Sequence, residues 1–554
     1  MRALISWAMP HLIVVPILLP LITAGCMLAL GEGRRPLKSA MSTISGLLNL
    51  GVVLVLAWWV LENGPVVYLP GNWPAPFGIV LVADQLSVLM VLLSVVIGIC
   101  ALFYSSARWE KAGVHFHPLG QLQVMGLSGA FLTGDLFNLF VFFEILLAAS
   151  YGLLLHGSGR PRVSAAVHYV AINIAASSLF LVGATTLYGV TGTLTMAHLA
   201  QRVLEVPEAD RWLLHTGSGV LAVAFLTKAG AWPLNFWLVP AYRSATAPVA
   251  AFFALLTKVG VYAILRLSTL LYAGQSETYG RTSLLAFGTI TAAFGALGML
   301  GSKRLASITA FSIAVSSGTL LAALSFRSEA VTGGAIFYLV SSTIGISALF
   351  LLTDVVERWR NSGSTDPDEA PFLSARFLEV ENVNLDDDEE RLVGRPIPAS
   401  IAFLALAFMT FALIIAGLPP LSSFLAKSLM LSEAMALPAV SGALQGQVWL
   451  FVAVLLGTGL MSLITLSRAG IRNFWSSVHR DPPMLRLAEG LPVAVLLLVS
   501  IALTVAAGPV TRYAQQIARE LHDPASYAEA VLSAATVPPP AKKRSDVEVE
   551  EVVP

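Results

Sequence analysis

The chain has 554 residues, of which 56% are apolar and only 12% are charged, and its mean hydropathy is +0.77. Soluble proteins average about 45–50% apolar and about 25% charged residues, so this composition excludes a soluble enzyme with a water-facing shell. The 33 basic residues balance the 33 acidic ones, and no basic face for nucleic acid is visible. Two cysteines in apolar runs offer neither a disulfide framework nor a CxxC metal site. We expect an all-α polytopic membrane protein.

Apolar runs of about 20 residues, the length that crosses a bilayer, recur about fourteen times along the chain. Charge clusters, glycines and prolines separate them. No small-residue cleavage site follows the first run, which predicts a retained helix and not a signal peptide. The predicted spans are 4–30, 40–61, 83–104, 117–134, 135–156, 163–190, 213–232, 246–266, 283–301, 305–326, 331–353, 399–435, 447–468 and 490–509.

The distribution of Lys and Arg among the loops predicts the orientation of the chain. The loops after the odd-numbered spans hold 19 of these residues, including Arg34, Arg35 and Lys38 after the first span. The opposite loops and the two termini hold 11, among them Arg266. Because basic residues gather on the cytoplasmic side, we expect the first set of loops to be cytoplasmic and both termini to face the other side.

Three lysines remain inside the predicted spans: Lys228, Lys258 and Lys427. A Lys at the centre of a membrane helix costs about 2.5–3.5 kcal/mol, and such residues usually mark an ion or proton pathway. Snorkelling to the interface could rescue Lys228. It fits Lys258 poorly, because this residue lies about 12 residues into its span, about 18 Å along the helix. We therefore interpret the three lysines as functional groups.

Glu144 is the one acid that the sequence places clearly near mid-membrane, about 13 Å along the helix from Asp135. An unpaired carboxylate there would stay protonated, whereas a Lys partner would let it ionise. Asp84, Asp135 and Asp354 are predicted to be helix-end or interfacial groups, and Asp135 is placed to cap its helix. Glu433 is ambiguous.

Two predicted spans, the seventh and the twelfth, contain residues that interrupt a helix near a buried Lys. A plain proline kink is the simple interpretation, but free carbonyls at membrane depth are tolerated only inside protein or beside a water-filled cavity. Spans five apart run in opposite directions, which predicts two inverted repeats, spans 4–8 and 9–13. The predicted helix breaks are at Pro233 and at Gly417, Pro419 and Pro420. The predicted units are 1–114 (spans 1–3), 115–272 (first repeat), 273–470 (second repeat) and 471–554 (span 14 and a disordered tail).

Four motifs resemble those of the D subunit of Mrp-type (Pha, Mnh) multisubunit Na⁺/H⁺ or K⁺/H⁺ antiporters. This family is similar to the antiporter-like subunits of respiratory complex I and membrane-bound hydrogenases. The resemblance covers most of 80–470, and no amphipathic helix of the kind that follows the last span in some complex I subunits is predicted in 510–554. The motifs are GDLFNLFVFFEILLAASYGLLL (134–155), LTKAGAWPLNFWLVPAY (226–242), SKRLASITAFSIAVSSG (302–318) and GLPPLSSFLAK (417–427).

The resemblance implies a function for each buried charge. It casts Glu144 and Lys228 as an ion pair at the mouth of a proton path, Lys258 as the central relay and Lys427 as the terminal site. It also implies partners: the other hydrophobic subunits of an antiporter in the lipid bilayer of the bacterial inner membrane, with H⁺ exchanged for Na⁺ or K⁺. No cofactor or metal ion is expected.

Other polar side chains could serve this path. Thr227 and Thr257 precede two of the lysines and could pass protons through their hydroxyls. His168 could take up protons from the cytoplasm, although an interfacial histidine with satisfied hydrogen bonds is an equal alternative. The acidic 354–398 segment and the 536–554 tail are predicted to be solvated and disordered, the former cytoplasmic.

Two rival hypotheses remain from the sequence. The chain could be a proton-pumping module of a redox complex of the complex I or membrane hydrogenase type, or a structural scaffold without its own ion path. No GxxxxGK[ST] motif is present, so nucleotide-driven pumping within this chain is not expected. The leading hypothesis is the proton-translocating subunit of a monovalent cation/proton antiporter, a transporter subunit and not an enzyme.

Overall fold

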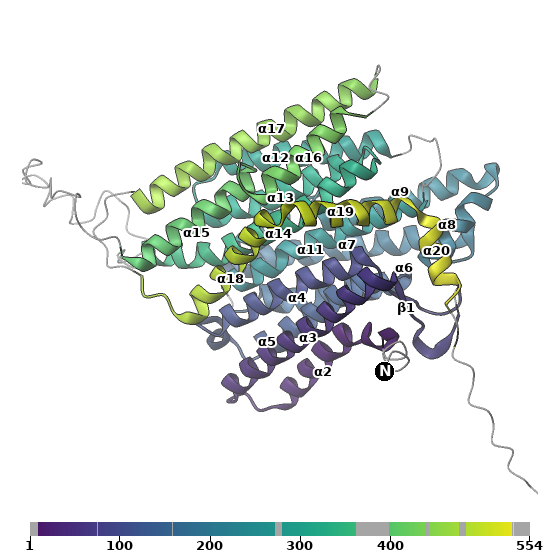
Figure 1. The fold of residues 1–554 in the computed structure, drawn as a ribbon. Coiled ribbons are helices and arrows are strands. Elements are labelled where there is room, and N and C mark those ends of the chain that lie inside the picture. Colours follow the sequence, from purple (N-terminus) through teal and green to yellow (C-terminus); the bar gives the residue numbers. More distant parts are fainter. Residues whose placement is uncertain are drawn as a thin grey trace, which may run out of the picture.

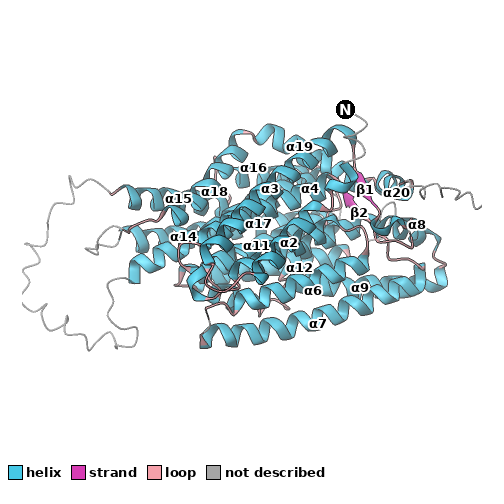
Figure 2. Ribbon diagram, turned by 90° about the horizontal axis from the view of Figure 1, so that it is seen from below, coloured by secondary structure: helices cyan, strands magenta, loops and turns pink. Residues whose placement is uncertain are grey.

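The computed structural model is a bundle of long helices that run side by side, and the segments that connect them lie at the two ends of the bundle (Figure 1). A two-stranded hairpin is the only sheet in the part of the chain that the structure describes (Figure 2). The prediction of disorder over 354–398 was wrong for residues 354–361, which continue the helix Glu329–Asn361, because Val355 and Val356 extend its buried apolar face. The rest of that segment, 362–397, and almost all of the 536–554 tail lie outside the described residues, so the predicted disorder there is not tested. The described residues are 9–534 without 75, 158, 272–279, 362–397, 438–442 and 476–482, together with residue 536.

The helices and strands follow one another in a nearly all-helical order. The strands are β1 (Val66–Tyr68) and β2 (Leu81–Ala83), which pair antiparallel. The helices are α2 (Val15–Ala29), α3 (Arg35–Asn63), α4 (Gln85–Ser105), α5 (Phe116–Leu132), α6 (Leu136–Leu154), α7 (Arg160–Thr191), α8 (Met196–Glu205), α9 (Arg211–Ala229), α10 (Leu238–Ser244), α11 (Ala247–Leu271), α12 (Arg281–Gly301), α13 (Leu305–Leu324), α14 (Glu329–Asn361), α15 (Ala399–Ala416), α16 (Ser422–Met435), α17 (Ala443–Gly470), α18 (Leu487–Val505), α19 (Ala507–His522) and α20 (Pro524–Leu532).

Every one of the fourteen predicted spans coincides with a helix or with a pair of helices. Among the described residues, eleven helices are individually long and apolar enough to cross a membrane. The chain is therefore a multi-pass helical membrane protein, while the count of fourteen crossings and the inverted repeats remain predictions.

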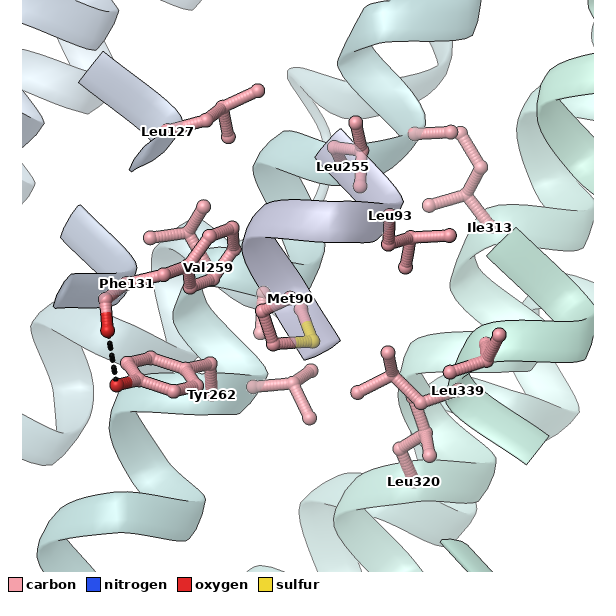
Figure 3. Close-up of a cluster of buried hydrophobic side chains, with 14 of the residues drawn as sticks. Met90, Leu93, Leu127, Phe131, Leu255, Val259, Tyr262, Ile313, Leu320 and Leu339 are labelled. Carbon is pink, nitrogen blue, oxygen red and sulfur yellow. Dashed lines mark hydrogen bonds between the residues drawn. The ribbon is translucent and has the colours of Figure 1, made fainter. Parts of the chain in front are cut away.

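Helices α11 and α14 form the centre of the bundle. In an apolar 18-residue stretch of each helix, 94% of the residues of α11 and 100% of those of α14 are buried, as expected for helices that are hydrophobic all round. Figure 3 shows part of this core, where Leu255 and Val259 of α11 lie among side chains of α4, α5, α13 and α14. The Tyr262 hydroxyl donates a hydrogen bond of 2.8 Å to the Phe131 carbonyl, which ties α11 to α5. Lys258, in the middle of α11, is therefore surrounded by protein on all sides.

Asp84 and Arg266 form a buried ion pair that the sequence did not predict. Asp84 caps α4 by accepting a hydrogen bond from the Ser87 backbone N–H at 2.8 Å. Its two carboxylate oxygens lie 2.8 and 2.6 Å from the Arg266 guanidinium. Arg266 lies within α11 and is 5% exposed, so its assignment to an outer loop was wrong. The side chain stays charged inside because a bidentate carboxylate compensates its lost hydration.

The chain continues after α18 as an amphipathic helix, contrary to the expectation for residues 510–554. Helix α19 buries the apolar stripe Ala514, Ile517, Ala518 and Leu521 and crosses the bundle in front of α14 and α11 (Figure 1). The apolar residues of this stripe recur every three or four residues in the sequence. The stripe is short and contains two alanines, so the segment is not hydrophobic enough to be predicted as a membrane span.

Candidate functional site

The three lysines lie inside the bundle, but they differ in burial. Lys258 is 0% exposed and Lys427 is 6% exposed, whereas Lys228 is half-buried in the last turn of α9. Charged side chains at this depth need polar partners, because an unpaired ammonium in an apolar interior loses most of its hydration energy. The partners of each lysine therefore indicate what it can do.

Lys258 is held by two hydroxyl groups of α13. Its ammonium donates hydrogen bonds to Ser316 Oγ at 3.0 Å and to Ser317 Oγ at 3.2 Å. Both serines are at most 1% exposed, and neither carries a charge. A hydroxyl group can accept a hydrogen bond from an ammonium and can also donate one to a neutral amine, so this environment suits both protonation states of Lys258.

A chain of serines leads from Lys258 towards the second broken helix. Ser316 Oγ lies 2.9 Å from Ser342 Oγ of α14. Ser341 precedes Ser342 on α14, and its Oγ lies 2.7 Å from Ser422 Oγ at the start of α16. In the sequence these residues appear only as Ser-Ser pairs inside apolar spans, a weak signal because the same pair occurs at 177–178. Their alignment depends on the packing of three separate helices.

Lys427 bridges the break between α15 and α16. Its ammonium donates a hydrogen bond of 3.1 Å to the carbonyl of Ala416, the last residue of α15, and lies 5.6 Å from the Tyr338 ring centroid. The last carbonyls of a helix have no partner within the helix and carry a partial negative charge. The break from Gly417 to Leu421 thus supplies the group that binds Lys427.

Gly417→Ala should disturb this arrangement. Gly417 has φ +75°, and a Cβ there would lie 2.6 Å from the Lys427 ammonium. We expect a loss of stability of about 1–2 kcal/mol from the left-handed backbone, together with displacement of Lys427 and slower transport. Thermal unfolding and ion transport of the assembled complex measure the two effects. Gly457→Ala is the matched control, because nothing lies within 4 Å of its Cβ position; equal behaviour of the two variants would contradict the prediction.

The break between α9 and α10 contains Gly230, with φ +72°, and Pro233. The Trp232 backbone N–H, freed by this break, donates to Thr291 Oγ1 of α12 at 2.8 Å. At the break between α15 and α16, the Ser422 backbone N–H donates a hydrogen bond of 3.0 Å to Thr504 Oγ1 of α18. A threonine from a distant helix therefore satisfies a backbone donor at each interruption.

Glu144 and Lys228 do not form a direct ion pair in the part of the chain that the structure describes. Glu144 is half-buried on α6, and its Oε1 atom has no hydrogen-bond partner there. The Lys228 ammonium lies 5.4 Å from the centroid of the Phe143 ring, which neighbours Glu144 in the sequence. The two charges are near enough to interact electrostatically but remain separated, an arrangement that leaves Lys228 without a fixed carboxylate partner.

A small pocket adjoins Lys228 on the side of α11. Its lining includes Tyr169 and Trp237 together with Leu256 and Val259, which flank Lys258 in the sequence. Tyr169 is 2% exposed, and its hydroxyl lies 2.9 Å from Ser150 Oγ of α6. Tyr169 was not among the predicted site residues, although it directly follows His168.

The other three residues predicted to relay protons, Thr227, Thr257 and His168, form no hydrogen bond with the lysines among the described residues. Thr227 and Thr257 donate hydrogen bonds to carbonyls of their own helices, at 2.8 and 3.2 Å, and not to a lysine. His168 is exposed on α7 and contacts the Ser164 carbonyl at 2.9 Å. The structure does not bring these three residues together with the lysines, and their relay roles remain untested. No cluster of potential metal ligands occurs among the described residues.

Comparison with known proteins gives consistent similarities. A family model described as NADH:quinone oxidoreductase/Mrp antiporter, transmembrane, matches residues 133–369. The probable D subunit of a K⁺/H⁺ antiporter of Rhizobium meliloti is 47% identical, over 95% of this chain and 98% of its own length. The D subunit of a Na⁺/H⁺ antiporter of Alkalihalophilus pseudofirmus is 34% identical, over 95% of this chain and 100% of its own length.

A solved structure has the same fold. A chain in the Mrp complex of a Dietzia species superposes with a TM-score of 0.79 at 24% identity, over 94% of this chain and 99% of that one. At this level of identity the likeness concerns the fold alone.

Proposed function

The chain belongs to the D subunits of Mrp-type cation/proton antiporters, which are related to the antiporter-like subunits of complex I, and from this premise we propose that it carries protons across the bacterial inner membrane in exchange for Na⁺ or K⁺. The relatives from Rhizobium meliloti and Alkalihalophilus pseudofirmus bear K⁺/H⁺ and Na⁺/H⁺ names. Other hydrophobic subunits are its partners, since a solved chain of the same fold is part of an Mrp complex.

In the proposed mechanism Glu144 gates the first lysine. When the carboxylate approaches Lys228, it stabilises the ammonium, and when it withdraws, Lys228 releases its proton more easily. The pocket beside Lys228 supports the next step, because Leu256 and Val259 of the helix of Lys258 also line it. In this mechanism the separation of Glu144 from Lys228 controls when a proton leaves Lys228.

The single observation that supports the proton path most strongly is the set of hydroxyls between Lys258 and Lys427. The hydrogen bonds form two sets, one from Lys258 through Ser316 to Ser342 and one from Ser341 to Ser422, the first residue of α16, and the two sets meet at adjacent residues of α14. A hydroxyl can accept one proton while it donates another, so each set can pass a proton without charging any serine permanently, and the proposal includes a transfer between the adjacent Ser342 and Ser341. Lys427, bound to the Ala416 carbonyl, receives the proton at the end of the path.

Everted membrane vesicles test the function directly. The complete set of antiporter subunits is expressed in cells that lack their own antiporters, and the collapse of a proton gradient is followed with a pH dye after addition of Na⁺ or K⁺. We expect exchange with one or both cations, and no exchange when this chain alone is omitted. Copurification of electron-transfer subunits, with no cation-dependent proton release, would instead support the redox-module hypothesis.

Ser316→Ala tests the hydroxyl path. The change removes a hydrogen bond to a charged group, which contributes about 1.5–3 kcal/mol, and 1.36 kcal/mol corresponds to about tenfold in rate. We expect about tenfold slower cation/proton exchange with normal assembly. Ser312→Ala is the matched control on the same helix, because among the described residues the Ser312 hydroxyl donates only to the Thr309 carbonyl. A Ser316→Ala variant as fast as Ser312→Ala would rule out the path through this hydroxyl.

A further inference from the structure

Helix α3 is polar on its buried side and apolar on its exposed side. Its seven buried residues follow one stripe at spacings of four and three, and all are at most 4% exposed. The first four are polar and the last three are apolar. In chain order they are Lys38, Ser42, Ser45, Asn49, Val53, Leu56 and Val60. The exposed side of α3, with Leu47, Leu48 and Leu54, suits contact with lipid, so the polar residues of the stripe lie against the other helices.

The neighbouring helices present polar side chains to the same stripe. The Gln121 amide of α5 donates to both the carbonyl and the hydroxyl of Ser42, each at 3.0 Å. Thr23 Oγ1 of α2 donates to Ser45 Oγ at 2.9 Å. His117 and Ser128 lie four residues before and seven residues after Gln121, on the same side of α5, and both are at most 4% exposed. We call these eight residues the polar seam: Thr23, Lys38, Ser42, Ser45, Asn49, His117, Gln121 and Ser128.

Several polar atoms of the seam have no hydrogen-bond partner among the described residues. These are both side-chain atoms of Asn49, the Ser128 hydroxyl and His117 Nδ1, whereas His117 Nε2 faces Glu110 at 3.5 Å. Each buried polar group without a hydrogen bond costs about 1–3 kcal/mol. Helices that use polar residues only to adhere to one another satisfy them mutually. Ordered water supplies such missing bonds in polar sites.

The seam is polar on one side of the membrane only. It begins near the start of α3, where Lys38 is 2% exposed, and Asn49 lies about 21 Å along the helix from Arg35. His117 on the neighbouring helix α5 lies 3.5 Å from Glu110 at the same end. Beyond Asn49 the stripe continues with Val53, which is 0% exposed. The polar part of the stripe therefore begins at the buried Lys38 and ends before Val53, so water that entered at the Lys38 end would stop there.

We propose that the polar seam is a water-filled half-channel that admits water and protons from the membrane face bearing Lys38, as far as Asn49 and no farther. The seam is separate from the lysine path. Leu127 and Phe131 of α5 belong to the same buried apolar cluster as Leu255 and Val259 of α11 (Figure 3), so α5 carries apolar side chains in the core that it shares with the helix of Lys258. The positive-inside rule predicts that the open end is cytoplasmic.

Single-cysteine variants of the complete complex test the half-channel. The background carries Cys26→Ser and Cys100→Ala, which remove both native thiols. Silver ions are added to right-side-out or everted vesicles, and the remaining thiols are then counted with a maleimide dye after denaturation. The informative variants are Ser45→Cys and Asn49→Cys, with Val53→Cys and Leu56→Cys as controls on the same stripe.

We expect silver to block positions 45 and 49 at least about tenfold faster than 53 and 56, because a thiol in water ionises whereas one in apolar surroundings stays inert. This difference should appear only when silver reaches the Lys38 face. Equal protection at 45, 49 and 53 would show a dry helix contact and overturn the proposal, as would blocking of 56 or access from the opposite face. If Asn49→Cys does not assemble, Ser42→Cys and Ser45→Cys decide the question, since Cys nearly matches Ser in size.

Discussion

Lys258→Met is expected to abolish cation/proton exchange while the complex still assembles. Lys258 is fully buried, and its ammonium contacts only the hydroxyls of Ser316 and Ser317 among the hydrogen bonds of the described residues. A group that gives and takes a proton typically contributes about 10²–10⁴-fold to a rate, so the initial exchange rate should fall at least about 100-fold. Dye-monitored exchange in everted vesicles measures this fall.

Assembly should survive this change because methionine has a similar length and no charge to desolvate. Replacing a buried charge by an apolar side chain of like volume is often neutral or stabilising. The quantity of assembled complex, from detergent gel filtration, checks this point. Lys303→Met is the matched control, since Lys303 is exposed in the α12–α13 loop. Exchange at the wild-type rate in Lys258→Met would support the scaffold hypothesis and refute a proton path through α11.

Glu144→Gln is the second change with a large expected effect. The amide keeps the shape of the side chain but cannot become negative, so Lys228 would lose the charge that stabilises its ammonium. We expect exchange to slow about 10- to 100-fold, which is below the range of about 10²–10⁴-fold for a lost acid or base, because Lys228 itself remains. The rate of the variant should stay low over the whole pH range, whereas the wild-type rate should vary with pH.

Glu205→Gln provides the control for removal of a carboxylate. Glu205 is 63% exposed in its side chain and pairs with Arg202 on the surface of α8. Its loss should leave exchange unchanged, since exposed pairs contribute little. If Glu144→Gln transported at the wild-type rate, the gating step would be wrong even if Lys258→Met were inactive, because the two variants test different steps of the path.

Much of the fold could be predicted from the sequence, because membrane spans depend on local hydropathy. The runs that predicted spans coincide with the helices, and the residues around Pro233 and Gly417 lie between helices as expected. Lys258 and Lys427 could also be found, since a Lys within an apolar run is conspicuous. The same local rule misjudged Lys38 and Arg266, which lie near the ends of their helices and were assigned to loops.

The tertiary structure decided which groups surround each charge. Lys258 meets serines that are 58 and 59 residues away, and Lys427 meets a carbonyl that is free only because α15 ends there. His168 and Tyr169 are neighbours in the sequence, yet the former is exposed and the latter is 2% exposed. Adjacent residues on a helix point about 100° apart, so only packing determines which one enters the site.

The sequence by itself determined that this chain is a polytopic helical membrane protein, which helices are interrupted, and that Lys258 and Lys427 lie within apolar helices. Only the tertiary structure decided that Lys258 meets serine hydroxyls of α13, that Ser341 of α14 meets Ser422 of α16, that Glu144 stands apart from Lys228, and that α3 turns its polar side inward. The physical reason is that hydropathy is a property of each segment, whereas the hydrogen bonds that make a buried charge tolerable come from other helices.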